Sequence, residues 1–346
     1  RIAGQVEIGA MRGGLLRHLV LEEVSIADSN GAQFLDAPRI EVRYSLPELL
    51  AGRIIFSEVI LERPTVHLIR LRTDRWNYQN IFRSGEGEGG APPRVELHDV
   101  SVRSGTVRVD VPIDEQPVKE PISAQGAEPA QPEVAVTTEG LVRVYRATGL
   151  QAELATVRVS TPNDDPIRVV IDRLAARLSD PALEIIDARG EVITQADSLR
   201  FDLEVAELPA TRVAGSGVVR WPQDTVRYDF SLTADTVALA DLRWIQPDFP
   251  DWSGHGEVRA LSTSNRHTEF RLTDLVLGRG DTRAAGRVIA IVDEDRGFGV
   301  RDLDMELRNV PLDAMRPYLD TLPFAGELTG RLRADGYNTL LTLSGD

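Results

Sequence analysis

Residues 226–232 read Val-Arg-Tyr-Asp-Phe-Ser-Leu, so apolar and polar side chains alternate with a period of two. This period places successive side chains on opposite faces of a β-strand. Similar runs lie at 39–44, 106–111, 200–205, 269–272, 284–292 and 302–307. Turn-forming residues separate them, as in the Asp-Ser-Asn-Gly of 28–31. The sequence therefore predicts an all-β protein, an elongated and curled antiparallel-rich sheet that is wet on one side, with few helices.

A pattern near the end of the chain occurs twice, at 237–260 and at 310–334. The second copy follows the first by 73 residues at Leu239 and Leu312, and by 74 at Gly256 and Gly330. Repeats usually form arrays in which each unit buries its apolar surface against its neighbours. The pattern favours a long surface over an enclosed active site.

Short helices are expected at 46–50, 239–245 and 312–319, the last two with apolar residues spaced by three. Each of these two helices would pack onto the sheet of its own repeat as a lid or end plug. Two stretches have linker composition: 84–93 is rich in Gly and Glu, and 112–132 contains five prolines. We therefore expect a β segment at 1–83, strands at 94–111 and a repetitive β segment at 133–346.

Composition excludes several kinds of partner. The formal net charge is −15, whereas nucleic-acid binding needs clustered Lys and Arg. The absence of cysteine removes thiol catalysis and thiolate metal sites, and it fits the periplasm without establishing it. No stretch approaches the roughly 20 apolar residues of a transmembrane helix. Because the chain begins at Arg1 and ends within an expected strand, we interpret it as a segment of a longer protein.

The motifs that would indicate an enzyme are missing or lie in the wrong context. The Gly-Glu-Gly-Glu-Gly-Gly of 85–90 is followed by Ala-Pro-Pro, not by the helix of a dinucleotide site. The five histidines lack the spacing of a zinc site, and Gly215-Ser216-Gly217 is interpreted as a kinked or bulged strand. The sequence predicts no catalytic residues, no cofactor and no metal.

The N-terminal quarter of the chain resembles a known family. The resemblance is carried by 14–16, 20–28, 37–42 and 49–68, which includes Leu-Glu-Arg-Pro-Thr-Val at 61–66, and by Arg-Trp-Asn at 75–77. These segments resemble the start of the AsmA-like superfamily, and within it the TamB (translocation and assembly module) type. The later strands are similar to the body of that family in style and carry no diagnostic motif, so TamB proper and other AsmA-like members both stay open.

This resemblance implies a bridge-like lipid transport protein of the periplasm, anchored in the inner membrane by a segment that precedes this chain. Phospholipid acyl chains would move along an apolar β-groove towards the outer membrane, in support of outer-membrane biogenesis. For the TamB type it also implies a part in outer-membrane protein insertion or secretion beside a TamA-like barrel partner.

The alternating runs supply the candidate groove. Its predicted lining is Phe201, Leu203, Val205, Tyr228, Phe230, Leu232, Phe270, Leu272, Leu303, Met305 and Leu307. The same alternation would occur if these residues packed against a second sheet in a sandwich. A second functional hypothesis is a scaffold that binds outer-membrane protein clients through its strand edges.

Overall fold

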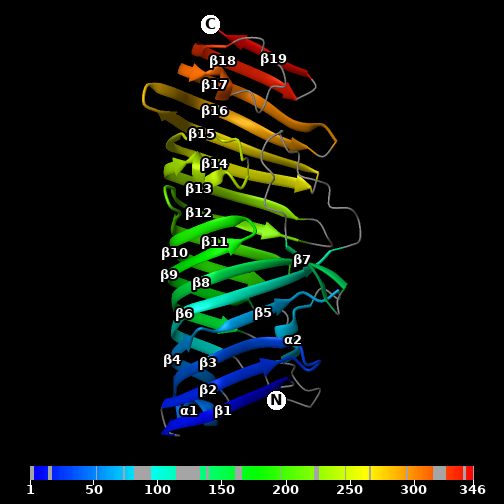
Figure 1. Ribbon diagram of the computed structural model, residues 1–346, viewed down its shortest axis with the longest axis vertical. Coiled ribbons are helices and arrows are strands. Elements are labelled where there is room, and N and C mark those ends of the chain that lie inside the picture. Colours follow the sequence, from blue (N-terminus) through cyan, green and yellow to red (C-terminus); the bar gives the residue numbers. More distant parts are fainter. Residues whose placement is uncertain are drawn as a thin grey trace. The chain divides into compact units, whose positions relative to one another are not determined.

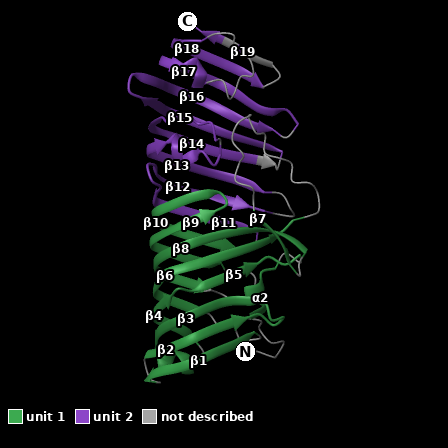
Figure 2. Cartoon of the chain, viewed as in Figure 1, with its two compact units in different colours: residues 1–119, 130–196 green, residues 120–129, 197–346 purple. Residues whose placement is uncertain are grey.

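The chain folds into two compact units (Figure 2). One comprises Arg1–Lys119 with Ala130–Ala196, and the other Glu120–Pro129 with Asp197–Asp346. The structure is a computed structural model that describes residues 4–14, 18–51, 53–72, 75–81, 95–113, 133–137, 140–159, 166–195, 197–221, 226–245, 247–264, 266–293, 295–314, 325–337 and 340–345.

The described residues of the first unit form strands and two short helices (Figure 1). Its elements are β1 (Gln5–Gly14), β2 (His18–Ala27), β3 (Gln33–Tyr44), α1 (Leu46–Leu50), β4 (Ile54–Glu62), β5 (Thr65–Ile69), α2 (Asn77–Ile81), β6 (Val95–Pro112), β7 (Glu133–Thr137), β8 (Gly140–Val159), β9 (Ile167–Ser179) and β10 (Ala182–Gln195).

Most pairings in this unit are antiparallel. Strands β1, β2, β3 and β4 pair in this order, as do β6, β8, β9 and β10, while β7 pairs with the first residues of β8. Both β4 and β5 pair with β6 in parallel. Parallel neighbours need a crossover connection, and α2 lies in the connection between β5 and β6. The sequence did not predict this crossover.

Strands β4 and β5 occupy one place in the sheet, since both lie between β3 and β6. The break between them falls at Arg63 and Pro64. Arg63 has a φ of 49°, and Pro64 has no N–H to offer the ladder. The neighbouring strand accommodates the break, because the N–H of Thr106 donates to the carbonyl oxygen of Pro64 over 2.8 Å.

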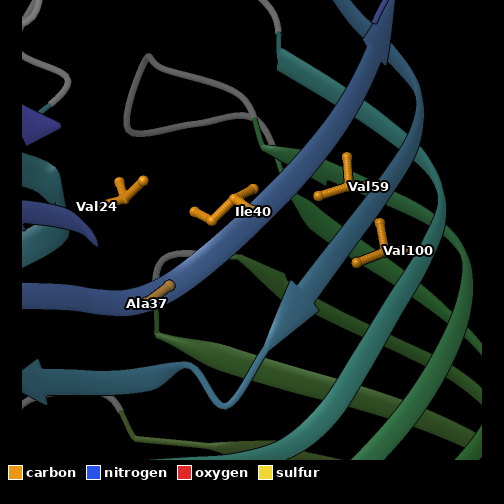
Figure 3. Packing of buried hydrophobic residues seen from close by; sticks show 5 residues of the cluster. All are labelled: Val24, Ala37, Ile40, Val59 and Val100. Atoms are coloured by element: carbon orange, nitrogen blue, oxygen red, sulfur yellow. The ribbon is translucent and has the colours of Figure 1, made fainter. Parts of the chain in front are cut away.

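The core of the first unit lies on one face of its sheet. Val24, Ala37, Ile40, Val59 and Val100 come from β2, β3, β4 and β6 and are at most 7% exposed (Figure 3). Partly buried apolar residues of the same strands and of β8 pack around them, among them Phe56 of β4 and Leu154 and Val157 of β8. Strand pairing thus brings apolar side chains of β2, β3, β4, β6 and β8 together.

The second unit is a ladder in which every described strand pairs antiparallel with the next along the chain. Its elements are β11 (Ser198–Glu207), β12 (Arg212–Arg220), β13 (Arg227–Ala238), the 3-10 helix η2 (Leu239–Leu242), β14 (Ser253–Ser264), β15 (His267–Arg279), β16 (Thr282–Asp293), β17 (Gly297–Pro311), β18 (Glu327–Tyr337) and β19 (Leu340–Gly345). Adjacent strands lie about 4.8 Å apart. Measured across the strands, the sheet formed by the nine described strands of this unit is therefore many times wider than a single strand.

The repeat predicted from the sequence has a structural counterpart. At the start of each copy, a leucine N–H donates to a carbonyl oxygen 2.9 Å away: Leu239 to Trp252, and Leu312 to Gly326. Residues 312–314 form a 3-10 turn, as η2 does in the first copy. Both copies therefore leave an odd-numbered strand through a tight turn that is bonded to the start of the next strand.

The all-β fold is confirmed, and so is the helix at 46–50. At 239–245 the expected helix is the shorter η2, and 315–319 lie outside the described residues. The expected linkers also lie outside them, except for Pro112, which ends β6, and Ile113, which follows it. The strand expected at Gly215-Ser216-Gly217 is confirmed, and Gly215 has a φ of 150°, but the bulge is not in this strand. The pairing of β12 is regular there, and the extra residues lie in β11 and β13, on either side.

Candidate functional site

The register of the second unit gathers predicted groove residues into rows that cross the strands. In one row Phe201 of β11 lies opposite Gly217, Gly217 opposite Phe230, Phe230 opposite Ala260, and Ala260 opposite Phe270. Paired residues share a face of the sheet, so the three phenylalanines from β11, β13 and β15 point to the same side. We call this side of the second unit the apolar face.

A second row of the apolar face runs beside the first. It consists of Leu203, Gly215, Leu232, Val258 and Leu272. Tyr228 also belongs to this face, because it lies two residues before Phe230 in the same strand.

The predicted residues of β17 reach the apolar face through β16. Ala290 of β16 pairs with Phe270, while Gly286 and Ala284 of the same strand pair with Met305 and Leu307. These three β16 residues are separated by even numbers of positions and share one face.

Leu303 packs against the buried cluster that contains Met305 and Leu307. Val205 is 5% exposed and lies where β11 carries one residue more than β12. The structure thus assembles ten of the eleven predicted residues on one face and places Val205 in a bulge beside it.

Large and small side chains alternate from strand to strand across this face. The odd-numbered strands supply Phe and Leu, and the even-numbered strands supply Gly, Ala and Val at the paired positions. A Cβ on Gly217 would overlap the backbone and Cβ of Phe230. The absence of a side chain there lets the rings of Phe201 and Phe230 approach across β12, with centroids 6.4 Å apart and planes tilted by 52°.

Across β11 to β15, burial on this face follows size in the reverse of the usual order: Ala260 is 0% exposed, whereas Phe201, Phe230 and Phe270 are only partly buried. Towards β17 the large side chains are buried as well, since Met305 is 8% exposed and Leu307 5%. In a two-sheet sandwich the large inward side chains would be the most buried. Here the large side chains cover the small ones beside them, and no described strand of the unit lies outside the single ladder. The arrangement supports an open apolar layer.

The opposite face of the same strands is charged. The carboxylate of Asp304 lies 2.5 Å from Arg331, and that of Glu269 lies 2.7 Å from Arg301 and 3.6 Å from Arg271. Charged side chains that project from a thin sheet keep it in solution and discourage stacking against another sheet. The two faces therefore differ in chemistry as the alternation predicts.

A residue of the first repeat packs against the apolar face. Trp252, whose carbonyl oxygen accepts the N–H of Leu239, packs against the buried cluster of Ala284, Met305, Leu307 and Val310. Where the sequence predicted a helix, this copy of the repeat has the 3-10 helix η2, and Trp252 precedes β14. The turn that follows η2 exposes Trp244 by 46% and Ile245 by 58%.

A buried polar cluster in the first unit escaped the sequence reasoning. The carboxylate of Asp110, which is 1% exposed, lies 2.8 Å from His67 Nε2 and 2.7 Å from Arg108 Nε. Its pKa is lowered: burial acts to raise it, but the hydrogen bonds from Arg108 and His67 outweigh burial. His67 and Asp110 are 43 positions apart, and only the parallel pairing of β5 with β6 brings them together.

Asn77 lies beside this cluster and is fully buried. Its side-chain amide donates to the carbonyl oxygen of His67 over 2.8 Å and accepts the N–H of Ile69 over 3.1 Å. The side-chain amide of Asn77 thereby makes the backbone hydrogen bonds to β5 that a neighbouring strand would otherwise make. The resemblance had drawn attention to Trp76 and Asn77 without indicating that Asn77 closes an edge of the sheet.

A histidine on the charged face makes stability depend on pH. His267 Nδ1 lies 2.9 Å from an Asp293 carboxylate oxygen, and Nε2 lies 3.4 Å from Glu269. The hydrogen bond to Asp293 raises the pKa of His267 and, in return, lowers the pKa of Asp293. The histidine therefore contributes most below about pH 6.5, the aspartate most above about pH 3.9, and the pair most between these values.

We expect His267→Gln to remove the alkaline limb of this dependence. Wild-type protein should lose thermal stability relative to the variant as the pH rises above about 6.5, because the raised pKa of the folded histidine makes the wild-type protein give up this proton at higher pH than the unfolded chain does. Melting temperatures of both proteins at several pH values measure the effect. Parallel curves for the two proteins would contradict the prediction.

The described residues contain no group of three His, Cys, Asp or Glu side chains placed to hold a metal ion. None of the helices in the described ranges combines the length and hydrophobicity that a bilayer span requires. Comparisons with protein-family models, with curated proteins and with solved structures gave no match for this chain.

Proposed function

We propose that this chain is a lipid-conducting β-sheet segment of a cell-envelope protein of the AsmA-like, TamB type. The observation that carries the proposal is the apolar face, where Phe201, Phe230 and Phe270 stay partly exposed around the buried Ala260 while the other face is charged. A soluble protein rarely exposes a continuous apolar surface unless that surface binds something.

Lipid transport gives this surface a physical purpose. A phospholipid with on the order of 30 methylenes, each worth about 0.8 kcal/mol, faces a barrier above roughly 20 kcal/mol to enter water unaided. Acyl chains lying against Phe201, Phe230 and Phe270 would stay out of water while the head groups remain solvated. The residues supply neither energy nor direction, so movement along the sheet would be diffusive.

Location and partners form part of the proposal and depend on the family resemblance. We place the segment in the periplasm, anchored to the inner membrane by a part of the protein outside this sequence, with a TamA-like barrel as a partner at the outer membrane. The charge of −15 suits neither nucleic acid nor an anionic bilayer as the partner of the charged face.

Photocrosslinking in cells tests the proposal on the intact protein. A photoreactive residue at Phe230 points into the apolar face, and the same residue at its neighbour Asp229, whose side chain is 50% exposed, points away from it. We expect phospholipid adducts at 230 and none at 229. Equal labelling at both positions, or only protein adducts at 230, would contradict a lipid-bearing face.

One observation favours the alternative function, a scaffold for outer-membrane protein insertion or secretion. Strand β7 pairs only with β8 among the described strands, and it exposes Val134 by 42% and Val136 by 84%. An edge of this kind, with exposed valines, can accept an extended client segment as an added strand. Protein adducts at Val136 with no lipid adduct at Phe230 in the same experiment would favour the scaffold.

A further inference from the structure

One arginine of the first unit lies among apolar side chains, where β8 pairs with β7. Leu141, Arg143 and Tyr145 are two positions apart along β8 and therefore share one face of the sheet. Their cross-strand partners on this face are all valines: Val136 and Val134 of β7, and Val111 and Val109 of β6. Arg143 is the only charged side chain among them.

These residues are continuous with the core of the first unit. Val107, two positions before Val109 in β6, pairs with Val66 of β5. Val66 in turn pairs with Leu35 of β3, which packs against the buried cluster of β2, β3, β4 and β6. Because paired residues share a face, Arg143 projects from the same side of the sheet as this core.

The side chains around Arg143 are only partly covered. Val134 is 42% exposed and Val136 84%, while Leu141 and Tyr145 are half-buried. The side chain of Arg143 itself is 38% exposed. We call these five residues the β7–β8 patch. Neighbouring apolar side chains that stay in water together are typical of a surface that binds an apolar ligand.

Two contacts hold the guanidinium group of Arg143 in place. Its central carbon lies 5.1 Å from the centre of the Tyr145 ring. Its Nε donates to Oδ2 of Asp180 over 2.8 Å, and its Nη2 lies 2.7 Å from the same oxygen. Asp180 comes from the turn between β9 and β10 and is 21% exposed in its side chain. Since both contacts go to Oδ2, this pair leaves Nη1 of the arginine and Oδ1 of the aspartate for other partners.

We propose that the β7–β8 patch binds a zwitterionic phospholipid, whose phosphate contacts Arg143 and whose ammonium group contacts Asp180. The inference rests on the lipid-binding function proposed above and adds a class of head group to it. Guanidinium groups bind phosphate oxygens through charge-assisted hydrogen bonds, and a carboxylate accepts such bonds from an ammonium group. The acyl chains would lie over Val134 and Val136 and remove these side chains from water.

The charges favour a zwitterionic head group over an anionic one. Arg143 and Asp180 together carry no net charge, so an anionic head group attracted by the arginine would also be repelled by the adjacent carboxylate. A zwitterion places an opposite charge against each of the two. The net charge of −15 on the whole chain adds to the repulsion of anionic lipids. A protein strand added to β7 would use the backbone of this edge and gives no role to an ion pair among valines.

Photocrosslinking of the full chain to mixed vesicles tests the proposal. The vesicles contain equal amounts of zwitterionic phosphatidylethanolamine and anionic phosphatidylglycerol with the same acyl chains, and a photoreactive residue replaces Val136. Mass spectrometry gives the ratio of the two lipids among the adducts, which is divided by the ratio obtained with the photoreactive residue at Phe230. This division removes any bias in how the acidic chain meets the two lipids.

Two variants that break the same ion pair should have different effects. Asp180→Asn should shift the adducts at position 136 towards the anionic lipid by about fivefold or more, because it removes the repulsion and leaves the arginine. Arg143→Gln should instead lower the total lipid adducts at 136 by about fivefold, because the phosphate loses its partner. A purely structural ion pair would give the same result in both variants.

Arg146→Gln is the matched control. Arg146 pairs with Glu133 over 2.6 Å on the opposite face of the same two strands, so this change should leave the lipid ratio unaltered. If lipid adducts form at Phe230 but the ratio at 136 ignores Asp180→Asn, or if 136 yields only protein adducts, the head-group site is overturned and the proposed function stands. The absence of lipid adducts at both positions would overturn both.

Discussion

Replacing Phe230 by Asp should lower the affinity of the full chain for phospholipid by roughly tenfold or more while leaving the protein folded. Burying a phenylalanine side chain against an acyl chain is worth about 2 kcal/mol, and a carboxylate at the same place would also have to lose its hydration. Phe230 is partly exposed and has no described strand above it, so the new carboxylate of the lipid-free protein can remain in water. We expect unfolding to become easier by only about 1 kcal/mol.

Binding of a fluorescent phospholipid and urea denaturation of the same preparations measure the two effects. Ser231→Asp is the matched control, because the adjacent residue receives the same side chain on the charged face and is exposed. It should change neither measurement appreciably. If Phe230→Asp instead unfolded the protein, at a cost of the several kcal/mol typical of a buried unpaired charge, the apolar face would be a packed interior and the lipid proposal would fail.

The second large effect is expected in the first unit, where Asp110→Ala should lower the free energy of unfolding by about 3 kcal/mol. The change leaves Arg108 and His67 without the carboxylate that both bond, and breaking one side of a buried ion pair typically costs about 3 to 5 kcal/mol. Their side chains are 27% and 25% exposed, so water can partly replace the lost partner and the lower end of this range applies.

Urea denaturation at neutral pH measures this loss. Asp229→Ala provides the comparison, because its pair with Arg259 spans 3.6 Å between side chains that are 50% and 61% exposed. Such a surface pair contributes less than about 1 kcal/mol. The lowered pKa of Asp110 adds a second expectation: the difference between wild type and Asp110→Ala should shrink as the pH falls below about 3.9, where the unfolded carboxyl group takes up its proton. Equal losses in the two variants would contradict a special role for the buried cluster.

Local patterns predicted those features that depend only on neighbours in the chain. Alternation at 226–232 and 302–307 identified strands and the side of each that is apolar, because the side-chain period of a strand is two whatever its partner. The repeat predicted two equivalent short helices; the two copies instead begin with 3-10 turns, and both carry the same leucine hydrogen bond. Glycine and proline marked the breaks between runs for the same local reason.

The register of the strands and the parallel crossover between β5 and β6 could not be predicted from local sequence patterns. The small residues Gly217 and Ala260 gave no signal as part of the candidate site, although glycines spaced by two in an alternating run mark one face of a strand. Their importance depends on lying beside Phe201, Phe230 and Phe270, which is a property of strand pairing. Likewise, nothing near His67 in the sequence indicates Asp110, because parallel pairing of β5 with β6 joins residues that are distant along the chain.

The sequence by itself determined that this protein is made of strands with one apolar and one charged side, since that outcome follows from the fixed geometry of an extended backbone. Only the tertiary structure decided that large side chains of odd-numbered strands cover small ones of even-numbered strands in one layer. Alternation is the same for an open sheet and for a sandwich, and the two differ only in what packs above the side chains. The burial of the side chains therefore distinguishes an open sheet from a sandwich: Ala260 is fully buried while the phenylalanines on either side of it remain partly exposed.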